Sequence, residues 1–399
     1  MVKGIKLGYI PEDKYSDYRY DVIFNAYKWD PQVGDSNTIS KYALLMDRQT
    51  AARLEQWAEE LSAETMAMEE ALFNKPELTK ELGLPKKILK TLHAKSNYVR
   101  EKNVRLMRFD FHPTEDGGWA ISEVNSDVPG GLAEASVFPT IAAKYFDAYA
   151  AHKNVAHLLL DAFKTKIKPG GTMAFVHATS YADDRQVMQL LGDTFESAGY
   201  RALYAAPDNI KWNKDGTAQD VDGIVRFYPL EWFKNLQRES DWIGFFDCKI
   251  PSCNHPSAMF VQSKRLPLIW DKLGLDIPTW KSLLPATVDP RQADKNAEGW
   301  ILKPALGRVG EDILIKGTMP EKKMLLIEKD AKKHPENWIA QKMFNSSPLL
   351  TQSGKQYHLC IGVLTVDGKS AGFYGRINPY ARIDQNAKDI PILVEKENI

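Results

Sequence analysis

Two short strands and the turn between them constrain this chain more than any other segment. Residues 106–112 (LMRFDFH) and 119–125 (WAISEVN) alternate aromatic or β-branched residues with polar ones, which predicts a pair of strands. Asp116-Gly117 between them is typical of a two-residue hairpin turn. A turn of that length would set Asp110 opposite Glu123 and Arg108 opposite Asn125, with all four side chains on one face.

This hairpin predicts a magnesium site. Two carboxylates that face each other on a sheet repel, unless a cation lies between them. Asp110, Glu123 and the amide oxygen of Asn125 supply the hard oxygen ligands that Mg²⁺ prefers, and they leave positions for phosphate oxygens and water. Arg108 could then bind a phosphate or a carboxylate bidentately. The alternative is a solvated hairpin whose charged positions simply face water.

Composition excludes several other classes of protein. With 399 residues, of which 44% are hydrophobic, the chain can form one large domain or two to three ordinary ones. Lys and Arg together number 52, as do Asp and Glu, so no excess charge indicates nucleic acid or an anionic membrane as partner. No run of 18 apolar residues suggests a membrane span.

The cysteines and the N-terminus predict a cytoplasmic protein. Cys248, Cys253 and Cys360 have no metal-type spacing, and three cysteines cannot form a closed disulfide framework. The first 14 residues lack the apolar segment of a signal peptide. Cys253 and the scattered histidines show no pairing with a base, so we assign them no chemistry.

Periodicity divides the rest of the chain into three patterns. Residues 40–103 show helical spacing, and a further helix is expected over 132–149. From Lys168 the order strand, loop, helix, strand indicates a small Rossmann-like unit, without the GxGxxG sequence of dinucleotide binding. Beyond Pro278 the chain reads as mainly sheet, with a hairpin turn at Asp367-Gly368.

A second hairpin has features of a phosphate-binding lid. In WILKPALGRVGEDILIK a strand ends on Lys303 and a loop with Gly307, Arg308 and Gly310 follows. Glycines allow backbone N–H groups to approach anionic oxygens, and Lys303 supplies a point charge. An ordinary exposed hairpin is the alternative.

Other single positions are open to two interpretations. The strand WIAQKMF could present Gln341, Lys342, Met343 and Phe344 to a purine, or could belong to the core. By themselves, Lys264 and Arg376 would be surface charges.

Taken in order along the chain, these segments resemble a known family. RxD, ExN, VDGIVRFYPLEW, KRLPLIW, KPALGRVG, AQKMF and GRIN are similar to the synthetase domain of glutathionylspermidine synthase and its stand-alone acid–amine ligase relatives. The resemblance covers most of the chain. It implies an α/β (α+β) ATP-grasp fold in circularly permuted order, in which the magnesium-binding strands precede the lysines that hold ATP.

The resemblance also implies roles for matching residues. Arg108 and Arg376 would stabilise charge on the transferring phosphoryl group. ATP would be held by Arg108, Asp110, Lys264, Lys303, Gly307, Arg308 and Gly310, with Gln341, Lys342, Met343 and Phe344 around the adenine. Asp110, Glu123 and Asn125 would hold one or two Mg²⁺ ions. The implied domains are a helical region with the magnesium hairpin (1–165), a Rossmann-like unit (166–280), an ATP-binding lid (281–345) and a return to the core (346–399).

Two departures from the family pattern affect the expected substrates. The bifunctional relatives carry an amidase domain ahead of the synthetase, and we do not expect one here. Residues 126–131 (SDVPGG) lack the run of hydroxyl and Cys residues that helps to hold glutathione in those relatives. Glutathione is therefore not the expected acid.

We predict an ATP-dependent carboxylate–amine ligase that works through an acyl phosphate. Its substrates would be a small-molecule or peptide carboxylate and an amine, either a polyamine or an amino acid, with Asp183, Asp184 or Glu231 as candidates to receive the amine. A homodimer is the default oligomer. The alternatives are a non-catalytic ATP-binding subunit, glutathionylspermidine synthase proper, and a kinase-like phosphotransferase.

Overall fold

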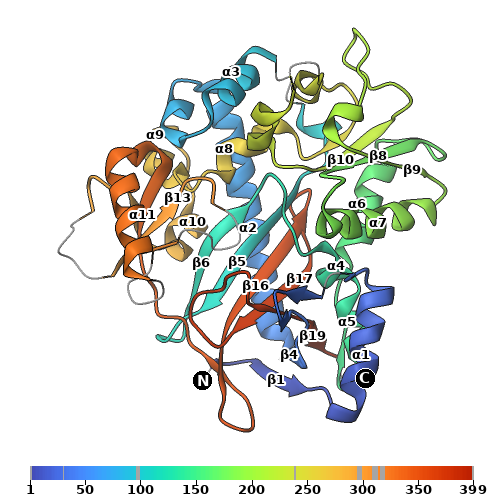
Figure 1. The fold of residues 1–399 in the computed structure, drawn as a ribbon, viewed down its shortest axis with the longest axis vertical. Helices are drawn as coiled ribbons and strands as arrows, with labels where there is room; N and C mark the ends of the chain where they lie inside the picture. The colour runs from blue at the N-terminus through green and yellow to red at the C-terminus, as the bar shows by residue number, and fades with distance from the viewer. Residues whose placement is uncertain are drawn as a thin grey trace.

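The computed structural model describes residues 2–29, 31–95, 99–237, 240–293, 299–307, 313–314 and 320–397. Within these ranges an antiparallel sheet lies at the centre of the molecule (Figure 1), with the order β18-β17-β16-β5-β6 and β15 beside β16. Its strands are β5 (Leu106–Pro113), β6 (Trp119–Asn125), β15 (Leu349–Leu350), β16 (Gln356–Val366), β17 (Lys369–Asn378) and β18 (Lys388–Ile390).

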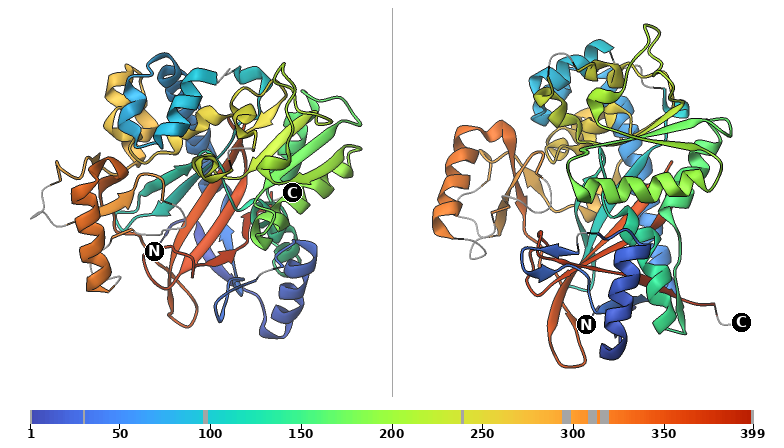
Figure 2. Two further views of the ribbon diagram at one scale, coloured as in Figure 1. Left: turned by 45° about the horizontal axis from the view of Figure 1, so that its top comes forward. Right: turned by 45° about the vertical axis from the view of Figure 1, so that its right-hand side comes forward.

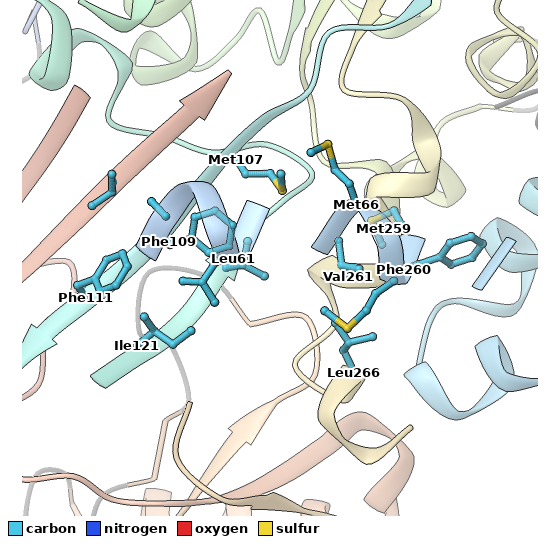
Figure 3. Close-up of a cluster of buried hydrophobic side chains, with 14 of the residues drawn as sticks. Leu61, Met66, Met107, Phe109, Phe111, Ile121, Met259, Phe260, Val261 and Leu266 are labelled. Carbon is cyan, nitrogen blue, oxygen red and sulfur yellow. The ribbon is translucent and has the colours of Figure 1, made fainter. Parts of the chain in front are cut away.

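One face of this sheet is covered by the long helix α2 (Arg48–Asn74), which Figure 1 shows running behind β5 and β16. The helix begins where the Asp47 carboxylate accepts a hydrogen bond from the Thr50 N–H. Figure 3 shows the apolar contact, in which Phe109, Phe111 and Ile121 of the hairpin lie beside Leu61. The opposite face of β5 and β6 is therefore the one left for polar side chains.

A parallel sheet of order β11-β10-β8-β9 lies beside the central sheet, drawn in green to yellow in Figure 1. Its strands are β8 (Thr172–His177), β9 (Arg201–Ala205), β10 (Gly223–Phe227) and β11 (Ser252–Cys253), and its helices are α6 (Val155–Lys164) and α7 (Ala182–Glu196). Parallel strands joined through a helix are the arrangement expected of a Rossmann-like unit. The strand–helix–strand pattern expected from Lys168 onward is confirmed.

A smaller sheet of order β12-β14-β13 lies at the other side of the central sheet, next to helix α11 (Figures 1 and 2). Its strands are β12 (Thr287–Val288), β13 (Trp300–Pro304) and β14 (Trp338–Lys342). The remaining sheets are β1 (Ile5–Tyr9), β4 (Tyr42–Met46), β19 (Ile392–Glu395) and β7 (Tyr149–Ala150), and the pair β2 (Gln32–Val33) and β3 (Ser36–Asn37). The other helices are α1 (Glu12–Asn25), α3 (Lys86–Lys95), α4 (Leu132–Ser136), α5 (Phe138–Ala142), α8 (Met259–Gln262), α9 (Trp270–Leu273), α10 (Pro278–Leu283) and α11 (Glu321–Lys333).

Two local predictions were wrong. Residues 42–46, expected to be helical, form β4, because a short apolar run fits a buried strand as well as a buried helix. The helix expected over 132–149 is two five-residue helices, and Pro139 lies in the first turn of the second. The expectation that the chain beyond Pro278 is mainly sheet is confirmed, since β12 to β19 lie there together with α11.

The turn at Asp367-Gly368 is confirmed, since β16 and β17 are joined by these two residues at positive φ (47° and 86°). No helix in the described part of the chain has the length and apolar composition needed to cross a membrane. The domain boundaries at 165, 280 and 345, the cytoplasmic location and the homodimer stay predictions.

Candidate active site

The polar face of β5 forms the floor of a large cavity. Arg108, Asp110 and His112 alternate with buried Met107, Phe109 and Phe111, so the period of the strand turns the first set toward the cavity and the second toward α2. The cavity has a volume of about 690 Å³. This is within the usual range for a small-molecule site.

The cavity brings together residues that the sequence separates by more than 250 positions. Eight residues predicted for the site line it, from β5, β6, β13, the segment after β14, and β17: Arg108, Asp110, Glu123, Asn125, Lys303, Met343, Phe344 and Arg376. The central sheet supplies the arginines and carboxylates, while Lys303 comes from the smaller sheet. The cavity therefore lies where these two sheets meet.

The predicted register of the hairpin holds at one end only. Arg108 does face Asn125, but nearer the turn Phe111 pairs with Ile121 and Pro113 with Trp119. The register shifts between Phe109 and Phe111, so Ser122 and Glu123 together lie opposite Asp110. The direct Asp110–Glu123 opposition was wrong.

The turn itself explains the discrepancy. The Thr114 N–H donates to the Gly118 carbonyl, so three residues, 115–117, lie in the loop, not two. Near the turn, each residue of β5 therefore pairs with a β6 residue one position earlier than predicted. The bulge adds one residue to β6, so the predicted pairing returns at Phe109–Val124 and Arg108–Asn125. A bulge often re-aims a side chain, and here it turns Glu123 toward Lys264.

Arg108 and Asp110 form a bidentate ion pair on the floor of the cavity. Arg108 Nε and Nη2 lie 2.7 and 2.8 Å from the two carboxylate oxygens of Asp110. The guanidinium lies 5.0 Å from the centre of the Tyr374 ring, and glycine at position 362 makes this possible, because a Cβ there would be 2.6 Å from Arg108 Cδ. Burial opposes the charge, yet Asp110 raises the pKa of Arg108.

Lys264 and Lys303 surround the Glu123 carboxylate. Lys264 Nζ lies 2.7 Å from Glu123 Oε2 and donates to the Gly307 carbonyl at 2.7 Å. Burial alone would raise the pKa of Glu123, but Lys264, with Lys303 and Arg108, lowers it to about 2. Glu123 is therefore ionised throughout the physiological range.

Lys303 is the more deeply buried lysine, with 4% of its surface exposed. Its ammonium donates to Gln341 Oε1 at 2.7 Å and to the Ser122 carbonyl at 3.3 Å. Burial lowers the pKa of Lys303 to about 8, against the opposing effect of Glu123. Gln341 itself lies behind Lys303 and bonds to Thr287, so it orients the lysine and is absent from the cavity wall.

The remaining predicted residues occupy different places. Lys264 does not line the cavity itself, but its ammonium contacts Glu123, which does, and also donates to the Gly307 carbonyl. The ammonium of Lys342 lies 4.5 Å from the centre of the Trp300 ring, outside the set that lines the cavity. Arg308 and Gly310 lie outside the described residues. Arg376 lines the cavity and donates to the Asp384 carbonyl at 2.6 Å.

Several cavity residues were missed by sequence reasoning. His112 and Tyr374 lie two residues from Asp110 and Arg376, so strand alternation could have found them. His112 is neutral, because burial lowers its pKa to about 4, and its ring packs against Phe344. Lys28 and Asp389, by contrast, had no local signal, and only the fold brings them to the cavity.

The donor set fits a hard divalent cation, with one correction. Asp110, Glu123 and Asn125 present carboxylate and amide oxygens to one cavity, which is the chemistry that Mg²⁺ prefers. Among the described residues, no group of three or more His, Cys, Asp or Glu side chains is arranged for a metal, and the amide nitrogen of Asn125 donates to Asp110 Oδ2 at 3.1 Å. The carboxylates do not depend on a metal to relieve their repulsion, because Arg108 and Lys264 lie against them.

Comparison with known proteins identifies the family. The family model described as glutathionylspermidine synthase pre-ATP-grasp matches residues 16–395, and the chain belongs to that family. A Haemophilus influenzae protein that carries the provisional name acid–amine ligase is 24% identical over 220 residues, which are 52% of this chain and 54% of that protein. The chain thus spans about half the length of the curated relative that it matches.

The fold has a solved counterpart. A glutathione synthetase-like effector from Globodera pallida, in its apo form, superposes with a TM-score of 0.65 over 96% of this chain and 98% of its own, at 9% sequence identity. This likeness concerns the fold alone. The predicted ATP-grasp fold of mixed α/β class is confirmed, and the hairpin β5–β6 precedes the lysine-bearing strand β13, as expected of the permuted order.

Proposed function

We propose that this protein is an ATP-dependent ligase that joins a carboxylic acid to an amine. The observation that carries the proposal is that cations from two different sheets meet two carboxylates and an amide in one cavity. Arg108 and Arg376 come from the central sheet, and Lys303 comes from the smaller sheet, with Lys264 directly behind Glu123. Such a distribution suits the triphosphate of ATP, whose phosphates would be bound by several cations while the γ-phosphorus is attacked.

The reaction has two balanced steps. An oxygen of the acid attacks the γ-phosphorus of ATP, the bond to the β-phosphate oxygen breaks, and ADP leaves with the electron pair. The amine nitrogen then attacks the acyl carbon, the carbon–oxygen bond to phosphate breaks, and the nitrogen loses a proton. Arg108 and Arg376 would stabilise the negative charge that develops in both steps, and each well-placed donor in such a site is worth about 3 kcal/mol.

Lys264 and Lys303 would hold the phosphates, and the segment from Met343 to Phe344 would pack against the adenine. Buried Lys303 is already desolvated, so its charge acts on a bound phosphate with little screening. Gly307, together with Arg308 and Gly310, would belong to the phosphate lid. Gln341 and Lys342, the last two residues of β14, would belong to the same adenine-binding segment as Met343 and Phe344.

Asp110, Glu123 and Asn125 would hold one or two Mg²⁺ ions. The metal would neutralise charge on the β- and γ-phosphates when bound. Arg108 and Lys264 now pair with the same carboxylates, so we expect these two side chains to turn toward the phosphates as the metal takes their place. Asp110 and Glu123 would then face the metal, and Arg108 and Lys264 would face the phosphates, so each charge would keep a partner of opposite sign.

The residues at the start of α7 support an amine site in the same cavity. Tyr181, Asp183 and Asp184 line it there, next to Phe227 and Trp232. Carboxylates beside aromatic rings suit a cationic amine. Glu231 is absent from the lining, so of the three acidic candidates it has the weakest support. The acid substrate is a small-molecule or peptide carboxylate.

The deciding experiment measures phosphate release from ATP and Mg²⁺ with acids and amines supplied in pairs, and mass spectrometry of the products. We expect phosphate only when both an acid and an amine are present, with an amide as product. Asp110→Asn/Glu123→Gln should abolish release, with circular dichroism as the check that this variant is folded, and Glu115→Gln, an exposed carboxylate change on the same hairpin, should not. Full turnover in the double variant would refute the proposal, and nucleotide binding without turnover in any pair would favour a non-catalytic subunit.

A further inference from the structure

Lys28 reaches the cavity from the N-terminal segment. It follows Tyr27, whose φ of 59° turns the chain sharply after α1. The flanking residues are anchored on α7: Tyr27 OH bonds to Asp193, and the Trp29 N–H donates to Gln186 Oε1 at 3.0 Å. This docking directs Lys28 away from solvent and into the wall of the cavity.

The ammonium of Lys28 lies between two carboxylates. It is 2.8 Å from Glu134 Oε1 and 2.9 Å from Asp389 Oδ2, and the three side chains are 13%, 10% and 7% exposed. Asp389 also accepts a hydrogen bond from Tyr374 OH at 2.9 Å. Burial alone disfavours the charged lysine, but Asp389 and Glu134 outweigh it and raise the pKa of Lys28.

Glu134 and Asp389 together form a site that could bind an ammonium group, and the ammonium of Lys28 occupies it. Asp389 lines the cavity beside Arg376, which lies opposite it on β17 at 4.0 Å, whereas Glu134 is behind the wall. A substrate cation that approached Asp389 would meet the charges of both Lys28 and Arg376. Like charges at such distances oppose binding strongly when they are shielded from water.

We propose that Lys28 is a specificity-determining residue of the amine site, which excludes a substrate cation from Asp389. The inference rests on the proposed ligase function. Asp183 and Asp184 line the same cavity from a different element, the start of α7. The protein should therefore favour an amine with one cationic group over a diamine or polyamine whose second ammonium would have to lie at β18.

Calorimetric binding of two probes tests the proposal: 1-aminobutane, with one ammonium, and 1,4-diaminobutane, with two. In the wild-type protein the diamine should bind no more tightly than the monoamine, apart from the twofold statistical factor of its two equivalent ends. Lys28→Met/Glu134→Gln keeps the net charge and leaves Asp389 open, so the ratio of diamine to monoamine affinity should rise on the order of tenfold, since one charged hydrogen bond is gained.

The matched control is Lys28→Met/Asp389→Asn. This variant has the same net charge but keeps the Glu134 carboxylate, which does not line the cavity. Its ratio of diamine to monoamine affinity should equal that of the wild type. Lys41→Met, at an exposed lysine paired with Glu12, should also leave the ratio unchanged. An unchanged ratio in the first variant, or an equal rise in both double variants, would overturn the proposal.

The wild-type protein alone keeps the proposal falsifiable if the double variants fail to fold, because a tenfold preference for the diamine in the wild type contradicts it. Probe binding needs no ATP turnover. A ratio that shifts as expected while no acid and amine pair releases phosphate would therefore count against the ligase function and not against Lys28. Phosphate release with an unshifted ratio would count against Lys28 alone.

Discussion

Nucleotide binding should be coupled to the protonation of Lys303. This lysine is 4% exposed at the end of β13, and burial lowers its pKa to about 8. The oxygens of a bound diphosphate or triphosphate carry negative charge, which favours the ammonium form and raises the pKa again. Binding should therefore take up protons from solution wherever Lys303 is partly neutral in the free protein.

The pKa sets the size and sign of the effect. Near pH 8 about half of the Lys303 population is neutral, so binding should take up about 0.5 proton, against about 0.1 at pH 7 and about 0.9 at pH 9. Since the bound state holds more protons than the free state, the affinity falls as pH rises through 8. The loss due to Lys303 should be about tenfold between pH 7 and pH 9.

Isothermal titration calorimetry with ADP and Mg²⁺, in two buffers that differ in ionisation enthalpy, measures the proton uptake directly. Lys303→Arg retains the positive charge but stays protonated at every pH used, so its uptake at pH 8 should fall by about 0.5 proton. Lys342→Arg, at the lysine over the Trp300 ring, is the matched control. Protonation of the nucleotide is common to all three proteins, so equal uptake in the wild type and Lys303→Arg would refute the reasoning.

Three further changes test the fold around the site. Phe109→Ala removes a fully buried ring beside α2 and should lower the free energy of unfolding by about 3–5 kcal/mol in urea denaturation, and a loss under 1 kcal/mol would contradict this packing. Gly131→Ala, at φ 87° with its Cβ 2.5 Å from the Tyr374 ring, should lower the melting temperature and phosphate release together. Asp127→Asn deprives buried Arg226 of its carboxylate and should cost about 3–5 kcal/mol, measured in the same way, whereas a neutral result would show that the pair is dispensable.

The β5–β6 hairpin shows which structural features the alternation of residues along a strand can predict and which it cannot. Alternation in LMRFDFH assigned Arg108 and Asp110 to one face because neighbouring residues of a strand always point to opposite sides. The partner of Arg108 was also predicted correctly. The bulge at Glu123 was not, since an extra residue in a strand leaves the local composition unchanged and depends on what the side chain meets across the sheet.

The lysines show a different limit. Lys264 and Lys303 were selected through the family resemblance, and their roles stay predictions. Only the packing of the smaller sheet against the central sheet brings Lys303 close to Glu123 and lowers its pKa. Burial is a property of the neighbours, so no inspection of the segment WILKP could have revealed this shift.

By itself the sequence determined the fold family, the strands that carry the arginines and carboxylates, and the order in which hairpin and lysines follow one another. These features depend on local periodicity and on motifs that are contiguous in the chain. The tertiary structure alone decided that Lys28, Glu134 and Asp389 form one ionic cluster. Side chains so far apart in sequence meet only through the packing of α1, α4 and β18 around the cavity, and pairwise charge interactions depend on distance in space.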